Sequence, residues 1–201
     1  MPSSQKLTRS ELKHSAILEA ARLEFAEHGF QNTSMDGVSA RAGVSKRTLY
    51  NHFSSKEELF DKITECLWKQ DDSIVYCPKR PLKQQLRQLA EKKLELMASP
   101  GYVGLARSVM GEYMRSQEMA QAAMARFEEN EDGVSIWFQA AMQDKRLREG
   151  DPKMIAHQFY GLLKTFALWP QLLAHQPAPT NEERDVIIEQ SVDMILAYYQ
   201  Q

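Results

Sequence analysis

Apolar residues recur every three or four positions through most of this 201-residue chain. Residues three and four apart share one face of a helix, so this spacing predicts amphipathic helices. The clearest stripes lie within residues 10–28, 55–72, 82–98, 152–175 and 181–200. Only nine Gly and eight Pro interrupt the chain, and it contains no internal repeat or low-complexity segment. The pattern therefore favours an all-α protein.

Helix-breaking residues divide these stripes into elements. Gly29 ends the first helix, and Ser99-Pro100-Gly101 ends the helix of residues 82–98. Gly150-Asp151-Pro152 stops one helix and starts the next, with Asp151 as the cap and Pro152 at the first helical position. Pro170 should kink its helix or end it early. Further helices are expected at residues 35–42, 46–53, 101–116 and 118–148, the last with a break near 130–133, which makes about nine in all.

Residues 29–59 contain two short helices joined by a sharp turn. Thr33 or Ser34 can cap the first of them, because a hydroxyl there accepts hydrogen bonds from otherwise free backbone N–H groups. Gly43 lies where the chain must turn, and glycine adopts a positive φ at little cost. Ser45 can cap the second helix in the same way.

A third helix, capped by Ser54 or Ser55, packs against this pair. The apolar positions of the segment form one small core, made of Val38, Ala42, Val44, Leu49 and Phe53. The second short helix leaves its polar residues outward, namely Lys46, Arg47, Thr48, Tyr50, Asn51 and His52. Two short helices with a glycine in the turn form a helix-turn-helix, whose second helix enters the major groove of DNA. The segment therefore predicts a DNA-binding domain.

A series of residues at fixed spacing extends this pattern over about Ile17 to Phe60. It comprises Ile17, Ala20-Ala21, Phe25, Gly29-Phe30, Thr33-Ser34-Met35, Ala42-Gly43-Val44-Ser45, Leu49-Tyr50, Phe53 and Lys56-Glu57-Glu58-Leu59. In these positions the chain resembles the N-terminal domain of TetR/AcrR-type transcriptional regulators. Gly37 departs from the family pattern, since a glycine inside a helix costs about 1 kcal/mol relative to alanine. Residues 140–173 more weakly resemble one C-terminal subclass of the same family.

The resemblance implies a fold of two domains. Residues 1–54 would form a three-helix helix-turn-helix domain, and residues 55–201 a helical body for effector binding and dimerisation. Residues 1–56 contain eight Lys/Arg and five Asp/Glu, a net charge of +3, whereas the remainder contains 17 and 22, a net charge of −5. A basic module on an acidic body fits contact with double-stranded DNA at one end.

Each polar residue of the motif has an expected role. Lys46, Arg47 and Thr48 lie in the first turn of the reading helix, which points at base edges. Arg47 suits a bidentate pair with guanine, worth about 1–3 kcal/mol of discrimination. The alternative is that Lys46 and Arg47 are solvated charges. In the family, the residues matching Tyr50 and Lys56 commonly touch phosphates.

The remaining candidates for DNA contact are Thr33, Ser34, Ser45, Asn51 and His52. Helix capping explains the three hydroxyl residues equally well. His52 either contacts the DNA backbone or packs against the first helix.

A single reading helix usually acts with a second copy, in a two-fold dimer that binds a pseudo-palindrome. In the family the last two helices form a four-helix bundle across the dimer, and here both carry broad apolar stripes. Gly161 would permit close helix approach. The predicted interface is Ile155, Phe159, Leu162, Leu163, Phe166, Val192, Ile195, Leu196 and Tyr199. Such broad stripes should also serve the monomer core, and we expect both uses.

The middle of the chain is rich in Met and aromatic residues, which suit a ligand cavity but more often form plain core. The resemblance favours the cavity, because bodies of this family typically enclose a small-molecule site. The predicted lining is Met110, Tyr113, Met114, Trp137, Phe138, Phe166 and Trp169. An unidentified effector would displace the helix at 55–72, change the separation of the two reading helices and release the operator. A repressor is the expected function, and an activator of the same family is the nearest alternative.

Other classes of protein fit the sequence less well. No segment approaches 18 uninterrupted apolar residues and no apolar leader begins the chain, so a cytoplasmic protein without a membrane partner is expected. Cys66 and Cys77 are isolated, which indicates reduced thiols. The sequence lacks H-E-x-x-H, Walker A and G-x-S-x-G motifs, and its acidic clusters spread around a helix, so neither catalysis nor a metal nor a cofactor is expected. A helical adaptor with an inactive DNA motif is the third alternative.

Overall fold

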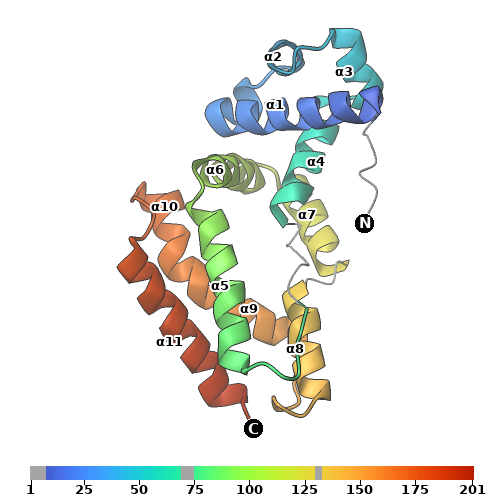
Figure 1. The fold of residues 1–201 in the computed structure, drawn as a ribbon. Coiled ribbons are helices and arrows are strands. Elements are labelled where there is room, and N and C mark those ends of the chain that lie inside the picture. The colour runs from blue at the N-terminus through green and yellow to red at the C-terminus, as the bar shows by residue number, and fades with distance from the viewer. Residues whose placement is uncertain (1–7, 69–74, 130–132) are drawn as a thin grey trace. The chain divides into compact units, whose positions relative to one another are not determined.

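The computed structural model describes residues 8–68, 75–129 and 133–201 (Figure 1). Within these ranges the chain is helical, with one isolated bridge, between Leu147 and Gln200. The prediction of an all-α protein is confirmed. The helices are α1 (Arg9–Asn32), α2 (Met35–Arg41), α3 (Lys46–His52), α4 (Lys56–Trp68), α5 (Leu82–Ala98), α6 (Pro100–Arg115), α7 (Gln117–Glu129), α8 (Gly133–Gln143), α9 (Pro152–Ala167), α10 (Trp169–Ala174) and α11 (Asn181–Tyr199).

Two of the predicted helices are each divided, so the described ranges hold eleven helices where about nine were expected. Residues 152–175 form α9 and α10 because Pro170, in the first turn of α10, has no N–H to continue the α9 ladder. Residues 118–148 form α7 and α8, and residues 130–132, where a break was expected, lie outside the described part. Asp151 caps α9 as predicted, accepting from the Lys153 N–H at 2.9 Å.

The chain divides into two compact units. Of the described residues, the first unit comprises 8–68 with 104–121, and the second comprises 75–103 with 122–129 and 133–201. Helix α4 belongs to the first unit, since the Phe60 ring packs on Phe25 and Phe30 of α1 at centroid distances of 5.0 and 4.7 Å. A boundary after residue 54 would instead separate α4 from these rings. Helix α4 groups with the first unit because its apolar side is buried against α1, although it lies after the helix-turn-helix in the sequence.

A segment distant in sequence completes the first unit. A Cβ added to Gly104 of α6 would lie 3.2 Å from the Ala26 Cβ of α1, so the absence of a side chain allows the two backbones to approach. Further along, the Gln31 amide donates to both carboxylate oxygens of Glu112, at 2.9 and 3.1 Å. Glu112 is only 5% exposed, and these bonds satisfy a carboxylate that would otherwise be costly to bury.

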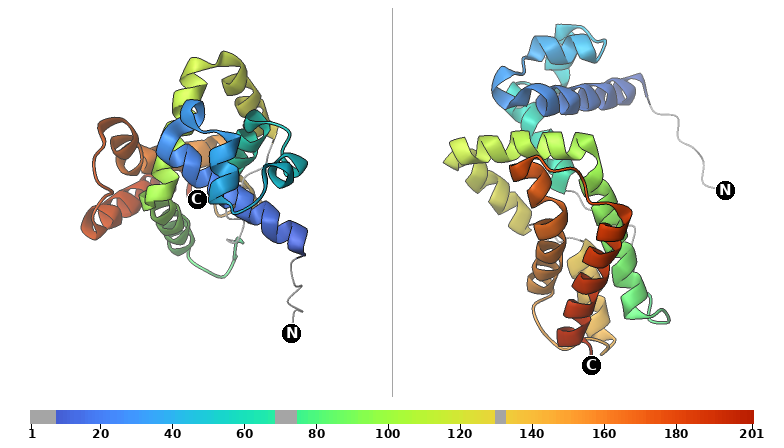
Figure 2. Two further views of the ribbon diagram at one scale, coloured as in Figure 1. Left: turned by 90° about the horizontal axis from the view of Figure 1, so that it is seen from above. Right: turned by 90° about the vertical axis from the view of Figure 1, so that its left-hand side faces the viewer.

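The second unit is built around helices α5, α8, α9 and α11. Helix α11 packs alongside α9 and α5 (Figures 1 and 2). On α8 the Trp137 ring packs edge-on with Phe138, and Phe138 in turn packs edge-on with Phe159 of α9. All three side chains are buried. The buried Gln85 accepts from the Trp137 indole N–H at 3.2 Å and donates to the Cys77 carbonyl at 2.9 Å. This amide therefore ties the chain entering α5 to the aromatic core.

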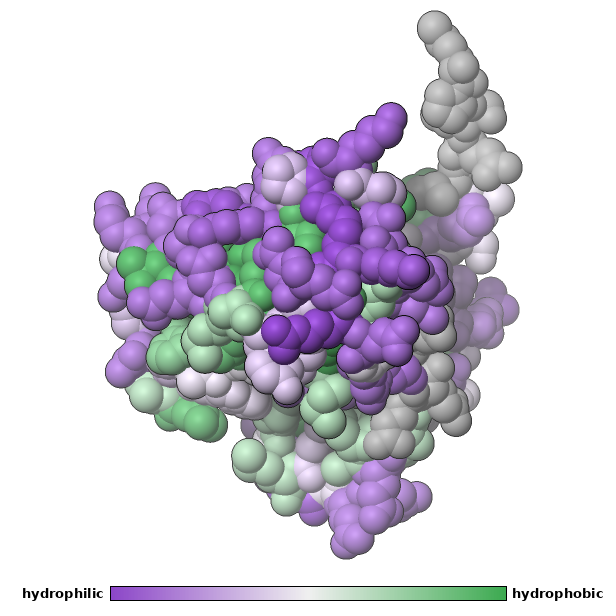
Figure 3. Space-filling view, turned by 90° about the horizontal axis from the view of Figure 1, so that it is seen from below, coloured by the Kyte–Doolittle hydropathy of each residue, from purple (hydrophilic) through white to green (hydrophobic). Residues whose placement is uncertain are grey.

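Ion pairs link α5 to α11 on the surface of the second unit. Lys83 of α5 pairs with Glu189 and Asp193 of α11, at 2.5 and 2.7 Å. In the space-filling view from below, hydrophilic residues dominate the near surface and hydrophobic residues show in patches between them (Figure 3). No described helix is long and apolar enough to cross a bilayer. Cys77 carries a free thiol, and the side chain of Cys66 lies outside the described part.

Candidate nucleic-acid interface

Local capping builds the two short helices of the motif. The Ser34 hydroxyl accepts from the Gly37 N–H at 3.0 Å and begins α2, and the Ser45 hydroxyl accepts from the Thr48 N–H at 3.2 Å and begins α3. Between them Gly43 has a φ of +65°, which side-chain-bearing residues rarely adopt. The helix-turn-helix predicted from these residues is therefore present, with Ser34 as the first cap.

A small apolar core holds α2 and α3 on α1. Val38, Leu49 and Phe53 are buried, whereas Ala42 and Val44 are only partly covered at the turn. The Phe53 ring stacks on His14 of α1 with centroids 5.1 Å apart. These contacts leave the opposite side of α3 open to solvent.

An ion-pair network fixes α2 against α1. Arg41 donates to Glu24 at 2.7 Å and through two further nitrogens to Glu27, at 2.9 and 2.5 Å. The hydrogen bonds with Glu27 are the largest cause that raises the pKa of Arg41, and they lower the pKa of Glu27. A Cβ added to Gly37 would lie 3.1 Å from a Glu24 carboxylate oxygen. The departure at Gly37 therefore has a steric reason: it leaves room for the carboxylate that Arg41 binds.

The outward residues of α3 differ in their contacts. The Lys46 ammonium pairs with Asp36 of α2 at 2.6 Å, and the Thr48 hydroxyl lies 2.9 Å from that of Ser45. Arg47 and Asn51 are exposed, and in the described part of the chain neither side chain has a hydrogen-bond or ion-pair partner. Tyr50 is 51% exposed. The side of α3 away from the core thus offers free donors of the kind that base edges and phosphates accept.

Two of the predicted DNA contacts point into the protein. Thr33 is 3% exposed, and its hydroxyl lies 2.8 Å from the Gly29 carbonyl oxygen at the end of α1. The Lys56 ammonium donates to the carbonyls of Phe30 and Thr33 at 2.9 and 3.1 Å and lies over the Phe30 ring. Carbonyls at a helix C-terminus lack intrahelical donors, and a cation there is favourable. Contact with DNA would require both side chains to turn outward.

His52 lies beside α1. Its ring centroid is 5.5 Å from that of His14, which corresponds to the packing alternative for this residue. Ser34 and Ser45 both act as caps while remaining exposed, so each can also meet a phosphate.

The seven residues predicted to line an effector cavity are divided between the two units. Met110, Tyr113 and Met114 lie on α6 in the first unit, where Met114 is 81% exposed. Trp137 and Phe138 are buried in the core of the second unit. Phe166 and Trp169 are exposed on α9 and α10. The effector lining therefore stays a prediction.

The residues predicted for the dimer interface fall into two groups. Those that are buried within the second unit are Ile155, Phe159, Leu163, Val192, Ile195 and Leu196. Those that remain partly or largely exposed are Leu162, Phe166 and Tyr199. Only the second group is free to contact another molecule extensively, and the dimer interface itself stays a prediction.

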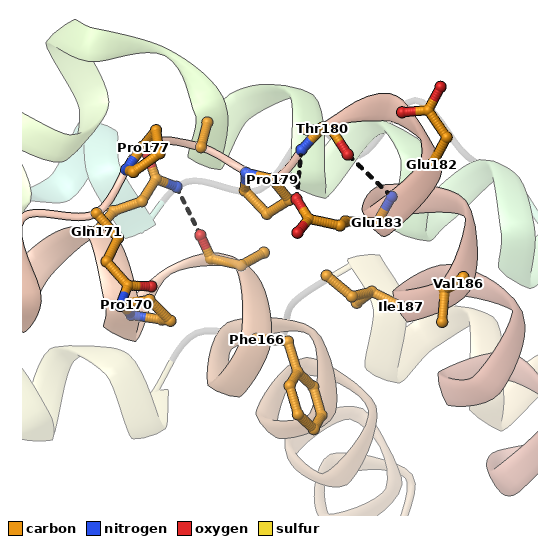
Figure 4. A pocket seen from close by; sticks show the side chains of 13 residues that line it. Phe166, Pro170, Gln171, Pro177, Pro179, Thr180, Glu182, Glu183, Val186 and Ile187 are labelled. Carbon is orange, nitrogen blue, oxygen red and sulfur yellow. Dashed lines mark hydrogen bonds between the residues drawn. The ribbon is translucent and has the colours of Figure 1, made fainter.

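Leu162, Phe166 and Tyr199 belong to an apolar face of α9 and α11. One groove of about 620 Å³ is lined by Gln158, Gly161, Leu162, Thr165, Phe166, Met194, Ile195, Tyr198 and Tyr199. A second cavity of about 620 Å³ adjoins it at Phe166, between the proline-rich loop after α10 and the start of α11 (Figure 4). The sequence prediction missed Met194 and Tyr198, which are exposed apolar residues of α11. They lie at helical spacing, but α11 is apolar on more than one side, so periodicity alone did not separate them.

Comparison with known families identifies both parts of the chain. Residues 17–63 match the model described as bacterial regulatory proteins of the tetR family. Residues 84–201 match that of the AefR-like transcriptional repressor C-terminal domain.

Solved structures and curated relatives agree with these matches. A TetR-family transcriptional regulator from Pseudomonas syringae pv. tomato is 39% identical, with 96% of this chain and 99% of that chain covered and a TM-score of 0.80. The flavonoid-responsive regulator FrrA is 29% identical over 94% of this chain and 97% of its own, with a TM-score of 0.69. The HTH-type regulator YhgD of Bacillus subtilis is 48% identical over 54 residues, which span 27% of this chain and 28% of that protein. The activator FasR of Mycolicibacterium smegmatis is 33% identical over 94 residues, which span 47% of this chain and 39% of its own length.

Proposed function

Since the chain belongs to the TetR family of bacterial transcriptional regulators, we propose that it is a ligand-responsive repressor that binds a pseudo-palindromic operator as a homodimer. The observation that carries the proposal is the geometry of α3. This helix buries Leu49 against the motif and leaves Arg47, Tyr50 and Asn51 outward. A reading helix of this kind acts in the major groove. Because the operator lies on the chromosome, we place the protein in the cytoplasm.

The proposed dimer uses the outer face of α9 and α11. The groove at Gly161 contains aromatic, Met and amide side chains but no charged residue along its lining. The buried centres of protein interfaces are likewise depleted of charge and rich in aromatic residues and Met. In a two-fold dimer the same patch meets itself, so one face suffices for both copies. A Cβ added to Gly161 would meet no other atom within 4 Å, so the space beside its backbone is open. A helix of the partner copy can therefore approach closely there.

The proposed effector is a small molecule whose identity the chain leaves open, and no resident cofactor is proposed. Its binding would favour a state whose two reading helices no longer match the half-site spacing. Moving such an equilibrium from 1:99 to 99:1 requires about 5.5 kcal/mol of differential affinity. The name of the flavonoid-responsive FrrA supports a small-molecule effector for this architecture. An effector that binds the protein and leaves operator affinity unchanged would contradict release.

Activation is the second candidate, favoured by the relative named as the activator FasR. A repressor blocks a promoter sterically, whereas an activator raises transcription above the basal level. In vitro transcription from the selected promoter separates them: repression predicts fewer transcripts on adding protein, and activation predicts more.

DNA binding itself is tested by fluorescence anisotropy with a duplex from the promoter of the protein's own gene. Affinity should fall steeply from 50 to 200 mM salt, because phosphate contacts release counterions. Arg47→Ala should relax base choice at one position per half-site. Salt-insensitive binding, or no effect of Arg47→Ala, would favour the helical adaptor.

Lys56 needs a separate measurement, because its ammonium is held by backbone carbonyls at the end of α1. If it contacts a phosphate on the operator, Lys56→Ala should weaken binding to all sequences alike at an unchanged melting temperature. If it only ties α4 to α1, the melting temperature should fall as well.

A further inference from the structure

Helix geometry does not present the polar residues of α3 equally. Successive residues are about 100° apart around a helix, so Arg47 and Asn51 each lie about 160° from the buried Leu49, on opposite sides. Lys46 lies only about 60° from Leu49. The centre of the solvent-facing side is therefore shared by Arg47 and Asn51, and Lys46 borders the buried side.

The polar residues of α3 also differ in whether their side chains contact other parts of the protein. Lys46 leans toward α2, where its ammonium meets Asp36 at 2.6 Å. The Thr48 hydroxyl is engaged with the capping Ser45 at 2.9 Å. Arg47 and Asn51, in contrast, have exposed polar ends with no protein partner among the described residues. Of the polar side chains in the first turn, only Arg47 is both central and unengaged.

We infer that Arg47 and Asn51 form the base-reading pair of this protein, and that Lys46 supplies charge without sequence preference. The inference rests on the proposed DNA-binding function and narrows it. Arg47 donates to the N7 and O6 atoms of a guanine. The Asn51 amide donates to N7 and accepts from the N6 amino group of an adenine.

The spacing of the two residues constrains the half-site. Four residues of helix advance about 6 Å, and stacked base pairs are about 3.4 Å apart, so a helix lying along the groove places the two contacts about two base pairs apart. Each operator half-site should therefore contain one guanine and one adenine about two base pairs apart. Lys46 and Asp36 lie at the edge of this contact, where the ammonium can exchange its carboxylate for a phosphate.

The test is in vitro selection of DNA from a random duplex library with the full-length protein, followed by sequencing. Asn51→Ala should lose the adenine preference, by roughly tenfold at that position, while the guanine preference stays. Arg47→Ala should show the reverse. Asn51→Gln should retain the preference for adenine, because glutamine makes the same bidentate pair.

Lys46→Ala is the matched control on the same helix. It should bind all selected sequences more weakly, lower the slope of log affinity against log salt by about 1, and keep the selected pattern. Loss of a base preference in Lys46→Ala, or an unchanged pattern in Asn51→Ala, overturns the inference while the proposed function stands. If the wild-type protein enriches no sequence at all, the proposed function fails and this inference fails with it.

Discussion

Helices α3 and α9 each bury one side, and their open sides are made of opposite chemistry. Helix α3 leaves Arg47 and Asn51 in solvent, whereas α9 leaves Phe166 uncovered beside the groove at Gly161, whose lining carries no charged residue. Unpaired donors gain most from a partner rich in acceptors, such as a nucleic acid. An uncharged apolar face gains most from another apolar surface. The comparison teaches that two faces of one chain lack different kinds of partner, which is why we propose DNA for the face of α3 and a second copy of the chain for the face of α9.

The largest expected effect separates two phenylalanines of α9 that are seven residues apart. Phe159 is 0% exposed and Phe166 is 57% exposed. Phe159→Ala should lower the free energy of unfolding by about 3–5 kcal/mol, because it leaves a cavity in the core. Phe166→Ala should cost far less when unfolding in urea is measured at a concentration low enough to dissociate a dimer. Equal losses would mean that the open face is covered within one chain.

A charge on the open face of α9 should break the proposed dimer. Phe166→Glu places a carboxylate at the junction of the two cavities. In a two-fold dimer the partner copy carries the same carboxylate at the same interface. Desolvation and like-charge repulsion should weaken association by about 100-fold, which is about 2.7 kcal/mol. Sedimentation equilibrium measures this change.

Ile136→Glu is the matched control for the dimer, since Ile136 is an exposed apolar residue of α8 that lines neither cavity. It should leave the association constant unchanged. A dimer that tolerates Phe166→Glu but not Ile136→Glu would move the interface away from α9 and α11.

A smaller effect tests why the DNA-reading end tolerates a glycine inside α2. In an unconstrained helix Gly37→Ala should add about 1 kcal/mol of stability. Here the new methyl group meets the Glu24 carboxylate at 3.1 Å, and Arg41 holds that carboxylate in place. The substitution should therefore gain little or destabilise the protein.

In a Glu24→Ala background the same Gly37→Ala change should recover its stabilising effect, and a double-mutant cycle of unfolding free energies measures the difference. Equal effects in both backgrounds would remove the steric reason for Gly37.

The smallest expected effect is a pH dependence at the start of α4. The hydroxyl and backbone N–H of Ser54 both donate to Glu58, and these bonds lower its pKa below the usual 4.5. A carboxyl with a lowered folded-state pKa stabilises the protein above the unfolded-state value, and this contribution is lost as the pH falls through the folded-state value. Between roughly pH 5 and pH 3, the melting temperature should therefore fall less in Glu58→Gln than in the wild type. Glu57→Gln, which removes the same charge one residue earlier, should not flatten the profile as much.

The helix-turn-helix could be predicted because its signals are local. Ser34, Gly43 and Ser45 act on backbone atoms within a few residues, as a cap or as a positive φ, and the structure places each as expected. The same holds for Asp151 and Pro152 at the start of α9. Such residues specify where a helix begins or turns regardless of what packs against it.

The roles of Thr33 and Lys56 could not be read in this way. Both lie in a segment that resembles a DNA-binding domain, and both have side chains suited to phosphate. The structure directs both side chains to backbone carbonyls at the end of α1, Thr33 to that of Gly29 and Lys56 to that of Phe30. Burial against another helix, rather than residue type, decided what each side chain bonds.

The sequence alone determined the helical class, the helix-turn-helix and the outward position of Arg47 and Asn51, because periodicity and capping are properties of neighbouring residues. Only the tertiary structure decided that Phe159 is core and Phe166 is surface, although seven residues, about two turns, place them on nearly the same side of α9. The tertiary structure also assigned α4 and residues 104–121 to the first unit. Which apolar residues become buried depends on the elements that cover them, and those elements come from distant parts of the chain.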